Sequence, residues 1–470
     1  MTRPDMDDKF HDECGVFAIA DHSEAANHAY LGLLAQQHRG QESAGIVSAH
    51  ESDLYPYRGM GKVFDVFTPQ IIESLPGRSA IGHVRYSTAG ASNLANAQPI
   101  LTDSWRGPLA LAHNGNLLHT DKLRRSLESE GAIFNSTSDT EVIQHLLARS
   151  PKQDLTEALR DVLALMRGAF SLVLLTPQCI YAARDPLGFR PLALGRLEGS
   201  WVVASETSAF DLIGAGYVRD VEPGEILLIY GQQTSSYHLP PAGRRAHCIF
   251  EHVYFARPDS RVFGRSVHIS RHEMGRQLAR EAPVPADIVV PVPDSGVTAA
   301  IGYSQESGIP LHMALIRNHY VGRTFIEPKQ SIRNFGVKVK LNPVPELLEG
   351  KRVILIDDSI VRGTTSRKIV EMVRGAGAAE VHFRISSPPT VSPCHYGIDT
   401  PTKKELIAAN KSVEEIRDHV SADSLEYLSL EGLRRSVQAN GNFCSACFDE
   451  SYPVPPDQST HQPRLFALEE

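Results

Sequence analysis

The sequence predicts two domains of different fold class, an α+β domain in the first half of the chain and an α/β domain in the second. In the first half, polar turns separate short apolar runs, such as CGVFAIA, SAGIVSA, AFSLVLL, WVVAS and EILLIY. Runs of this length predict strands, and several of them predict stacked sheets. In the second half, helical segments separate the runs DIVVPVP, VILIDD and VHFRIS, which is the order of a parallel sheet.

Length and composition agree with this division. The chain has 470 residues, of which 42% are hydrophobic and 22% charged, typical of globular domains with their own cores. The formal net charge is -8, so we expect no general affinity for nucleic acid or anionic membranes. No apolar run approaches the ~18 residues that a membrane span needs.

The segments between and around the two domains are polar. Residues 1–13 form an acidic leader without the apolar core of a secretory signal, so we expect a cytoplasmic protein with reduced cysteines. Residues 231–245 contain two adjacent prolines and predict a linker, and the proline-rich segment from Tyr452 predicts a loose tail. Helical patterns are expected at 29–37, 139–147 and 366–374.

The strongest local pattern is VILIDDSIVRGTT at 353–365, in which apolar strand formers precede two carboxylates, a loop of small residues and a helix. Ligands of open α/β sheets lie beyond the carboxyl ends of the strands, where these groups are expected. The amides of 362–365 and the hydroxyls of Thr364 and Thr365 suit a phosphate, and Asp357 and Asp358 suit ribose hydroxyls or Mg²⁺. An acidic strand end before a capped helix explains the same residues equally well.

A second loop and a basic segment lie upstream of this pattern. PVPDSG at 291–296 ends another apolar strand, and by itself it predicts only a turn. Residues 317–340 are strongly basic, which suits either a solvated face or a lid over an anionic substrate. The segment contains Arg317, Arg323, Lys329, Arg333, Lys338 and Lys340 against the single acid Glu327.

The string VILIDDSIVRGTT resembles the phosphoribosyl pyrophosphate motif of type I phosphoribosyltransferases, and PVPDSG resembles their pyrophosphate loop. The resemblance implies a flexible loop that closes over the pyrophosphate and excludes water from a reactive sugar cation. It also implies Mg²⁺ at Ser295, Asp357 and Asp358. The implied binding residues are Asp294, Ser295, Gly296, Asp357, Asp358, Ser359, Arg362, Gly363, Thr364 and Thr365.

Cys14 opens the first apolar run and is a candidate nucleophile. A thiolate needs a neighbouring base. If cleavage after Glu13 made Cys14 the first residue, its own α-amino group, with a pKa of roughly 7.7–8, could be that base. The simpler interpretation is a buried strand cysteine.

Three further strings favour the nucleophile. QHRGQESAG at 37–45, GHVRYSTAG at 82–90 and AHNGNL at 112–117 each predict a turn when taken singly. In this order after a near-terminal cysteine, and before SDTE at 138–141, they resemble the glutaminase domain of class II, N-terminal-nucleophile amidotransferases. The resemblance implies an αββα sandwich.

The resemblance also implies a role for each matching residue. Arg85 would bind the glutamine carboxylate, Asp139 its α-ammonium group, and Thr88 its backbone. The Asn114 side chain and the Gly115 amide would form the oxyanion hole. Arg39 and, in EHVYFARPDS, Tyr254 match positions that couple the two active sites.

Together the two halves resemble the glutamine phosphoribosylpyrophosphate amidotransferases, over roughly residues 14–450. The implied reaction hydrolyses glutamine at Cys14 and passes ammonia internally to phosphoribosyl pyrophosphate. The products are 5-phosphoribosylamine, glutamate and pyrophosphate, in the first step of purine synthesis. The implied divisions are a propeptide at 1–13, a glutaminase domain at 14–240, a phosphoribosyltransferase domain at 241–450 and a tail at 451–470.

Four cysteines need a separate explanation, whereas Cys179, beside a predicted strand, is expected in the core. Cys444 and Cys447 have the two-residue spacing of metal ligands, but one such pair is also compatible with a redox-active or incidental role. With Cys248 and Cys394 the residues themselves are equally compatible with zinc, with a 4Fe–4S cluster and with no metal. Their sequence contexts resemble the iron–sulfur branch of the family, which has a cleaved propeptide. The resemblance therefore implies a structural 4Fe–4S cluster.

The resemblance further implies purine nucleotides as feedback inhibitors and a homotetramer. Two other hypotheses are a catalytically inactive phosphoribosyl-binding regulator and an iron–sulfur electron carrier. The complete set of Cys14, Arg85, Asn114, Asp139 and the Asp357-Asp358 pair weighs against the regulator. The electron carrier leaves every other motif unexplained.

Overall fold

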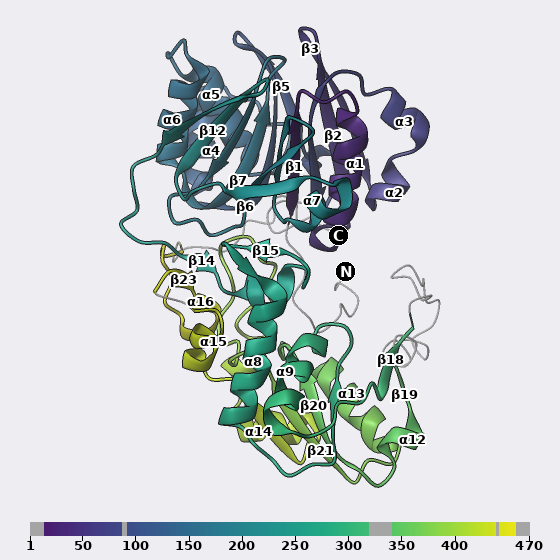
Figure 1. The fold of residues 1–470 in the computed structure, drawn as a ribbon. Coiled ribbons are helices and arrows are strands. Elements are labelled where there is room, and N and C mark those ends of the chain that lie inside the picture. The colour runs from purple at the N-terminus through teal and green to yellow at the C-terminus, as the bar shows by residue number, and fades with distance from the viewer. Residues whose placement is uncertain (1–13, 87–91, 319–340, 439–440, 457–470) are drawn as a thin grey trace, which may run out of the picture.

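The computed structural model describes residues 14–86, 92–318, 341–438 and 441–456. Two parts lie one above the other in Figure 1, a large sandwich of two sheets at the top and a smaller α/β part below it. The expected leader at 1–13 lies outside the described residues, and so do residues 319–340 of the basic segment and residues 457–470 of the tail.

The first sheet of the sandwich contains the strand that follows Cys14. Its seven strands are antiparallel, with β1 at the centre between β10 and β4. The apolar runs of the sequence became its inner strands because their side chains are buried on both faces. In spatial order the strands are β11 (Gly216–Asp220), β9 (Ala193–Leu197), β10 (Ser200–Ala204), β1 (Gly15–Ala20), β4 (Ser79–Arg85), β2 (Ser43–His50) and β3 (Asp53–Met60).

The second sheet has six antiparallel strands and corrects two expectations. AHNGNL lies inside the long strand β6 and is not a turn. The predicted linker at 231–245 was wrong at its start, because Gln233–His238 forms the edge strand β13, whose exposed side chains lack the apolar signal of a strand. The spatial order is β13 (Gln233–His238), β12 (Glu225–Tyr230), β8 (Ile180–Arg184), β7 (Arg167–Leu175), β6 (Gly107–Leu118) and β5 (Ile100–Ser104).

Helices cover the outer face of each sheet, which gives the expected αββα sandwich. Alternate side chains of β1 point to opposite faces: Val16 and Ala18 pack between the two sheets, whereas Phe17 and Ile19 pack under the helices. The first sheet carries α1 (Ala25–Ala35), α2 (Val63–Val66), α3 (Pro69–Glu73) and α7 (Ser208–Ile213), and the second carries α4 (Thr120–Ser129), α5 (Thr140–Arg149) and α6 (Leu155–Leu165).

The lower part is built on a four-stranded parallel sheet, as expected. The strands in spatial order are β17 (Ile288–Pro291), β20 (Arg352–Asp357), β21 (Glu380–Ile385) and β22 (Ser424–Tyr427). One apolar cluster packs this sheet against α8 (Val267–Glu281) and α9 (Val297–Ser307), and another packs its other face against α13 (Thr364–Gly375) and α14 (Val413–Val420). Short elements complete this part: α12 (Pro345–Leu348), α15 (Leu430–Ser436), α16 (Ala446–Asp449) and the antiparallel pair of β18 (Leu315–Arg317) and β19 (Leu341–Pro343).

The two parts meet through segments that are far apart in the sequence. A short parallel pair joins β14 (His247–Cys248), just after the linker, to β23 (Phe443–Cys444), near the end of the described chain. The turn η3 (Glu251–Phe255) and the hairpin of β15 (Arg261–Val262) and β16 (Arg265–Ser266) follow. The expectation of a loose tail was wrong at its start, because the Tyr452 hydroxyl donates a 2.6 Å hydrogen bond to the Pro393 carbonyl.

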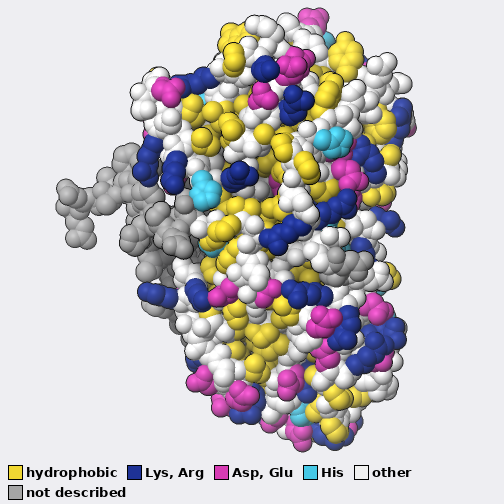
Figure 2. All heavy atoms as spheres, turned by 90° about the vertical axis from the view of Figure 1, so that its left-hand side faces the viewer, with side chains coloured by type: hydrophobic (Ala, Val, Ile, Leu, Met, Phe, Trp, Pro, Cys, Tyr) yellow, Lys and Arg dark blue, Asp and Glu magenta, His cyan; other side chains and the backbone are white. Residues whose placement is uncertain are grey.

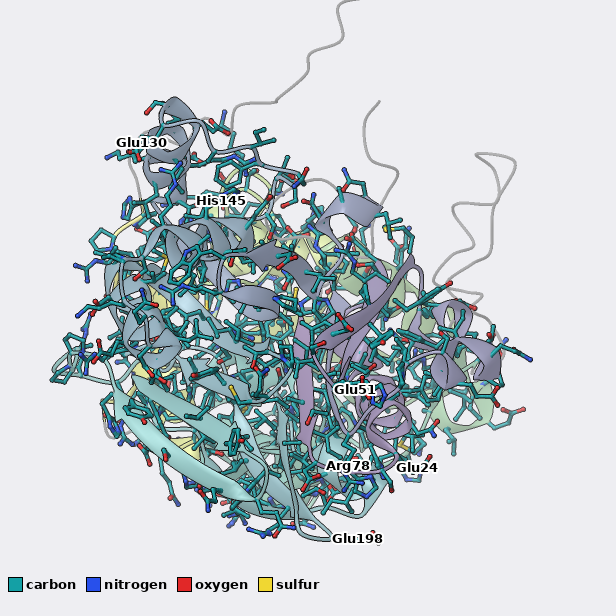
Figure 3. The ribbon with its side chains drawn as sticks, turned by 90° about the horizontal axis from the view of Figure 1, so that it is seen from above. Glu24, Glu51, Arg78, Glu130, His145 and Glu198 are labelled. Carbon is teal, nitrogen blue, oxygen red and sulfur yellow. The ribbon has the colours of Figure 1, made fainter. Side chains whose placement is uncertain are left out.

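The surface is mixed in charge. On the face in Figure 2, acidic and basic side chains are interspersed with scattered hydrophobic ones. Seen from above in Figure 3, Glu130 and His145 lie on the side of α4 and α5, whereas Glu24, Arg78 and Glu198 lie at the opposite rim. Among the described helices, none is both long and apolar enough to cross a membrane.

Candidate functional site

Cys14 lies at the start of β1, in the middle of the first sheet. Gly15 pairs with Val84, so Cys14 and Arg85 lie next to each other at the same end of two neighbouring strands. Cys14 is 8% exposed, and its Sγ lies 3.5 Å from the Tyr86 carbonyl oxygen, to which the thiol donates. Burial raises the pKa of the Cys14 thiol, and the nearby Arg85 charge opposes that rise.

The expected oxyanion residues lie in β6 of the second sheet. Asn114 is fully buried, and its Nδ2 donates to the Ser205 hydroxyl at 3.3 Å. The Val16 amide donates to the same hydroxyl at 3.0 Å. Ser205 therefore links Asn114 to the strand of Cys14 across the two sheets.

Gly115 has a conformation that requires glycine. Its φ is +145°, and a Cβ there would lie 2.2 Å from the Ala169 carbonyl oxygen of β7. The peptide can lie flat against β7 only because no side chain intervenes.

Asp139 closes the same site from the start of α5. Its Oδ2 accepts a 2.8 Å hydrogen bond from the Leu117 amide of β6. Its charge acts on the Cys14 thiol, as does that of Glu42, and Glu42 in turn lies 3.8 Å from Arg85. The structure thus brings together Cys14, Arg85, Asn114, Gly115 and Asp139, whereas Thr88 lies outside the described residues.

The second site lies at the carboxyl end of β20. Asp357 and Asp358 are 2% and 1% exposed. The Ser295 hydroxyl donates to Asp357 Oδ1 at 3.1 Å, so the loop after β17 and the end of β20 meet at one carboxylate. Ser295, Asp357 and Asp358 are oxygen donors, which Mg²⁺ prefers.

The loop that is expected to bind phosphate, after β20, has the predicted strand–loop–helix form. Gly363 has φ +81° and immediately precedes α13, which begins at Thr364. Arg362 forms a 3.1 Å ion pair with Glu405. Of the basic segment, Arg317 is described and pairs with Asp294 of the pyrophosphate loop.

Two models of protein families match the two halves of the chain. A glutamine amidotransferase domain matches residues 83–212, and a phosphoribosyl transferase domain matches residues 273–387. The amidophosphoribosyltransferase of Bacillus subtilis (strain 168) is 48% identical over 460 residues, which cover 97% of each chain. That of Methanothermobacter thermautotrophicus is 50% identical over 94% of this chain and 95% of its own.

A solved structure extends this similarity to the fold. Glutamine phosphoribosylpyrophosphate amidotransferase from B. subtilis, complexed with ADP and GMP, superimposes with a TM-score of 0.91 at 48% identity. The match covers 95% of this chain and 99% of that one. The chain belongs to the amidophosphoribosyltransferase family.

Buried ion pairs connect the two halves of this chain. Arg39 is 1% exposed, and its Nε donates to the Cys14 carbonyl at 3.1 Å. Its guanidinium also binds Glu251 of η3 through two hydrogen bonds of 2.8 and 3.0 Å, and it binds Glu206. Arg190 binds the same Glu251 carboxylate.

The pKa values reflect this pairing. Burial raises the pKa of Glu206 and Glu251, but nearby groups outweigh it and leave both below the usual range. The groups that lower the pKa are His38, whose Nε2 lies 2.8 Å from the carboxylate, and Arg39 for Glu206, and Arg39 and Arg190 for Glu251. No sequence motif predicts Glu206, Glu251 or Arg190 as site residues, although Glu251 stands in the string EHVYFARPDS that contains Tyr254.

Tyr254 lies on the same turn, partly buried, and packs edge to face on Phe255. Buried Arg271 of α8 holds this turn from below by donating to the carbonyls of His252 and Ala256 at 2.9 and 2.7 Å. Burial lowers the pKa of Arg271 to about 10, and the negative charge of Asp358 in the second site partly opposes that decrease. The turn therefore lies between Cys14 and Asp358.

Cys248, Cys394, Cys444 and Cys447 line one cavity where the two parts meet. None of the six cysteines is in a disulfide. Burial raises the pKa of all four thiols, and mutual repulsion between them adds to that rise for Cys248, Cys444 and Cys447. Within the described ranges, no three His, Cys, Asp or Glu side chains converge closely enough to hold a metal ion. The four thiols that line the cavity are nevertheless soft donors of the type that binds zinc or an iron–sulfur group. Cys179 packs partly buried against the sandwich core, as expected.

His83, beside the first site, predicts a pH-dependent stability. It is fully buried, and burial lowers its pKa to about 3. The unfolded chain protonates this imidazole near pH 6.5, whereas the folded chain keeps it neutral down to about pH 3. The free energy of unfolding is therefore highest above pH 6.5 and decreases as the pH falls toward 3. From pH 6.5 to pH 5 this loss is about 2 kcal/mol. Chemical unfolding of a His83→Gln variant should show a correspondingly shallower loss over that interval. An unchanged pH dependence in the variant would contradict the claim that buried His83 causes this loss of stability.

Proposed function

We propose that the chain catalyses the amidophosphoribosyltransferase reaction, with glutamine and phosphoribosyl pyrophosphate as substrates. The observation that carries the proposal is one chain with a buried Cys14–Arg85–Asn114 site and an Asp357–Asp358 phosphate loop, in a family named for this activity. An inactive phosphoribosyl-binding regulator is disfavoured, because every expected residue of the glutamine site and of the phosphoribosyl site that lies in the described part of the chain is present.

At the first site, the Cys14 thiolate attacks the glutamine amide carbon, and the oxyanion that forms accepts hydrogen bonds from the Asn114 side chain and the Gly115 amide. The amide nitrogen takes up the proton that the Cys14 α-amino group removed from the thiol and leaves as ammonia, and water then hydrolyses the thioester to glutamate. Arg85 and Asp139 hold the carboxylate and the α-ammonium group of glutamine, and Thr88 supports its backbone.

At the second site, ammonia forms a bond to the anomeric carbon of the sugar as the bond to pyrophosphate breaks. Mg²⁺, held by Ser295, Asp357 and Asp358, would neutralise charge on the pyrophosphate. Residues 362–365 bind the 5-phosphate at the start of α13, and Asp294 and Gly296 contribute to the pyrophosphate loop. Ser359 supports the carboxylates, because its hydroxyl donates to Asp358. Ammonia passes between the sites inside the protein, where it stays unprotonated and nucleophilic.

The test measures glutamate and pyrophosphate together, from purified protein with glutamine, phosphoribosyl pyrophosphate and Mg²⁺. Both products are expected in equal amounts. In Asp357→Asn, pyrophosphate release should fall by about 10²-fold with either glutamine or ammonia as donor, since one ligand charge is lost. Absence of both products from intact wild-type protein would overturn the proposal.

Maturation is part of the proposal. Residues 1–13 act as a propeptide, and their removal makes the Cys14 α-amino group the base of the first site. Residues 14–240, 241–450 and 451–470 then form the glutaminase domain, the phosphoribosyltransferase domain and the tail. Intact mass decides, because an active chain that still begins at Met1 would contradict this mechanism.

Cys248, Cys394, Cys444 and Cys447 are proposed to hold a 4Fe–4S cluster that joins the linker region, the second domain and the C-terminal segment. The shared cavity supports this assignment. Protein prepared without oxygen should contain iron and acid-labile sulfide in equal amounts, about four of each per chain. Cys447→Ser should lose both, whereas Cys179→Ser should keep both. Zinc in place of iron would contradict the cluster.

The inhibitors and the oligomeric state are proposed from the relatives of this chain. The B. subtilis structure was solved with ADP and GMP, so purine nucleotides are proposed as feedback inhibitors here. A homotetramer is proposed on the resemblance to the family alone. The cytoplasm is the proposed compartment, because six free thiols and a cluster need reducing conditions.

A further inference from the structure

A loop of the lower domain touches the backbone of Gly115. The loop spans residues 394–397, begins at Cys394 and ends at Gly397. A Cβ on Gly397 would lie 2.9 Å from both Cα and the carbonyl carbon of Gly115 and 3.2 Å from its carbonyl oxygen. The two glycines therefore pack backbone against backbone, and any side chain on Gly397 would push Gly115 away.

The next residue of β6 is held by the same loop. The Asn116 Nδ2 donates a 3.0 Å hydrogen bond to the carbonyl oxygen of His395. Gly115 and Asn116 thus both have contacts with residues about 280 positions later in the sequence.

The loop is itself firmly anchored. The Tyr396 ring stacks on Phe189 of the sandwich, with ring centres 4.1 Å apart and planes inclined by 20°. The Tyr396 amide donates to Cys394 Sγ at 3.3 Å, and its hydroxyl donates to the Val454 carbonyl at 2.6 Å. Because these contacts fix the loop, it can keep Gly115 and Asn116 in place.

Gly115 is enclosed on its other side as well. It pairs with Phe170 of β7, and the Ala169 carbonyl occupies the place where its Cβ would be. With β7 on one side and Gly397 on the other, the Gly115 peptide has little freedom to rotate. Rotation matters here, because an oxyanion donor must point at the oxyanion before it forms.

We propose that Gly397 and the Asn116–His395 hydrogen bond position the Gly115 amide for oxyanion stabilisation. The lower domain thereby supplies positioning residues to the glutaminase site. This inference rests on the proposed function. If it holds, glutamine hydrolysis depends on the position of loop 394–397. The ammonia-dependent reaction at Asp357 and Asp358 does not depend on it.

The main variant is Gly397→Ala in the full chain. The glutaminase kcat is expected to fall at least about 10-fold with little change in KM, because an oxyanion donor acts mainly in the transition state. Pyrophosphate release with ammonia should stay at the wild-type rate. The alkylation rate of Cys14 by iodoacetamide, followed by peptide mass, should also be unchanged, since that reaction forms no oxyanion.

Two further variants separate positioning from general damage. Asn116→Ala removes the hydrogen bond without adding volume and should lower the same kcat by about 3- to 10-fold. Gly131→Ala adds a side chain at a positive φ of +88°, against +105° at Gly397, in a place where nothing lies within 4 Å, and should leave the kcat unchanged.

The outcomes are distinguishable. If Gly397→Ala and Asn116→Ala keep the wild-type glutaminase kcat, the inference is overturned. If Gly397→Ala does not fold, Asn116→Ala decides alone. Wild-type protein without glutamine-dependent activity would overturn the proposed function instead.

Discussion

Cys14→Ser is expected to lower glutamine-dependent pyrophosphate release by at least about 10³-fold, the scale on which loss of a nucleophile acts. Release with ammonia as donor should remain at the wild-type rate. The physical reason is the separation of the two chemistries. Cys14 lies at the start of β1 in the sandwich, whereas Asp357 and Asp358 end β20 of the lower domain. The measurement is initial pyrophosphate release with each donor at saturation.

Cys179→Ser provides the matched control. It makes the same atomic change in the same domain, at a thiol that packs against the sandwich core. Both donor activities should survive in it. A Cys14→Ser enzyme that still uses glutamine would refute the nucleophile, and one that also loses ammonia-dependent activity would show that the change damages the whole protein.

Local patterns predicted the fold well where burial dictated the sequence. EILLIY is β12 in full, and VILID lies within β20, because strands buried on both faces leave an uninterrupted apolar run. β13 was missed because an exposed edge strand needs only backbone pairing. AHNGNL was misassigned because its polar residues mark a site inside a strand and not a turn.

The site residues that could be predicted are those that stand close together in the sequence. The phosphate loop was visible because its carboxylates, glycine and hydroxyls are contiguous from Asp357 to Thr365. The partners of Arg39 were not, since Glu206 and Glu251 lie 167 and 212 positions away and are isolated acids in sequence. Gly397 carries no chemical group at all, and only its contact with Gly115 reveals it. Contacts between distant segments are fixed by tertiary packing, which a single sequence does not display.

Glu251→Gln is expected to cost about 3–5 kcal/mol of unfolding free energy, because it removes the carboxylate charge that pairs with buried Arg190 and one of the two that pair with buried Arg39. Glu251 is fully buried between Arg39 and Arg190, and its carboxylate holds the lower domain to the strand of Cys14 through Arg39. The measurement is urea unfolding of wild type and variant at pH 7. Glu371→Gln is the control. Its pair with Arg367 has the same 2.8 Å separation but is about half exposed, so the cost there should stay below about 1 kcal/mol.

The pH dependence of this cost tests its electrostatic origin. Burial raises the pKa of Glu251, but Arg39 and Arg190 outweigh it and lower the pKa below the ordinary 4.5. A carboxylate with a lowered pKa stabilises the folded state fully above its unfolded value and loses that contribution as the pH falls toward its folded value. The stability gap between wild type and Glu251→Gln should therefore be constant from pH 7 to about 5.5 and shrink below pH 4.5. A gap that persists unchanged at low pH would mean that Glu251 acts through its shape and hydrogen bonds, with no contribution from its charge.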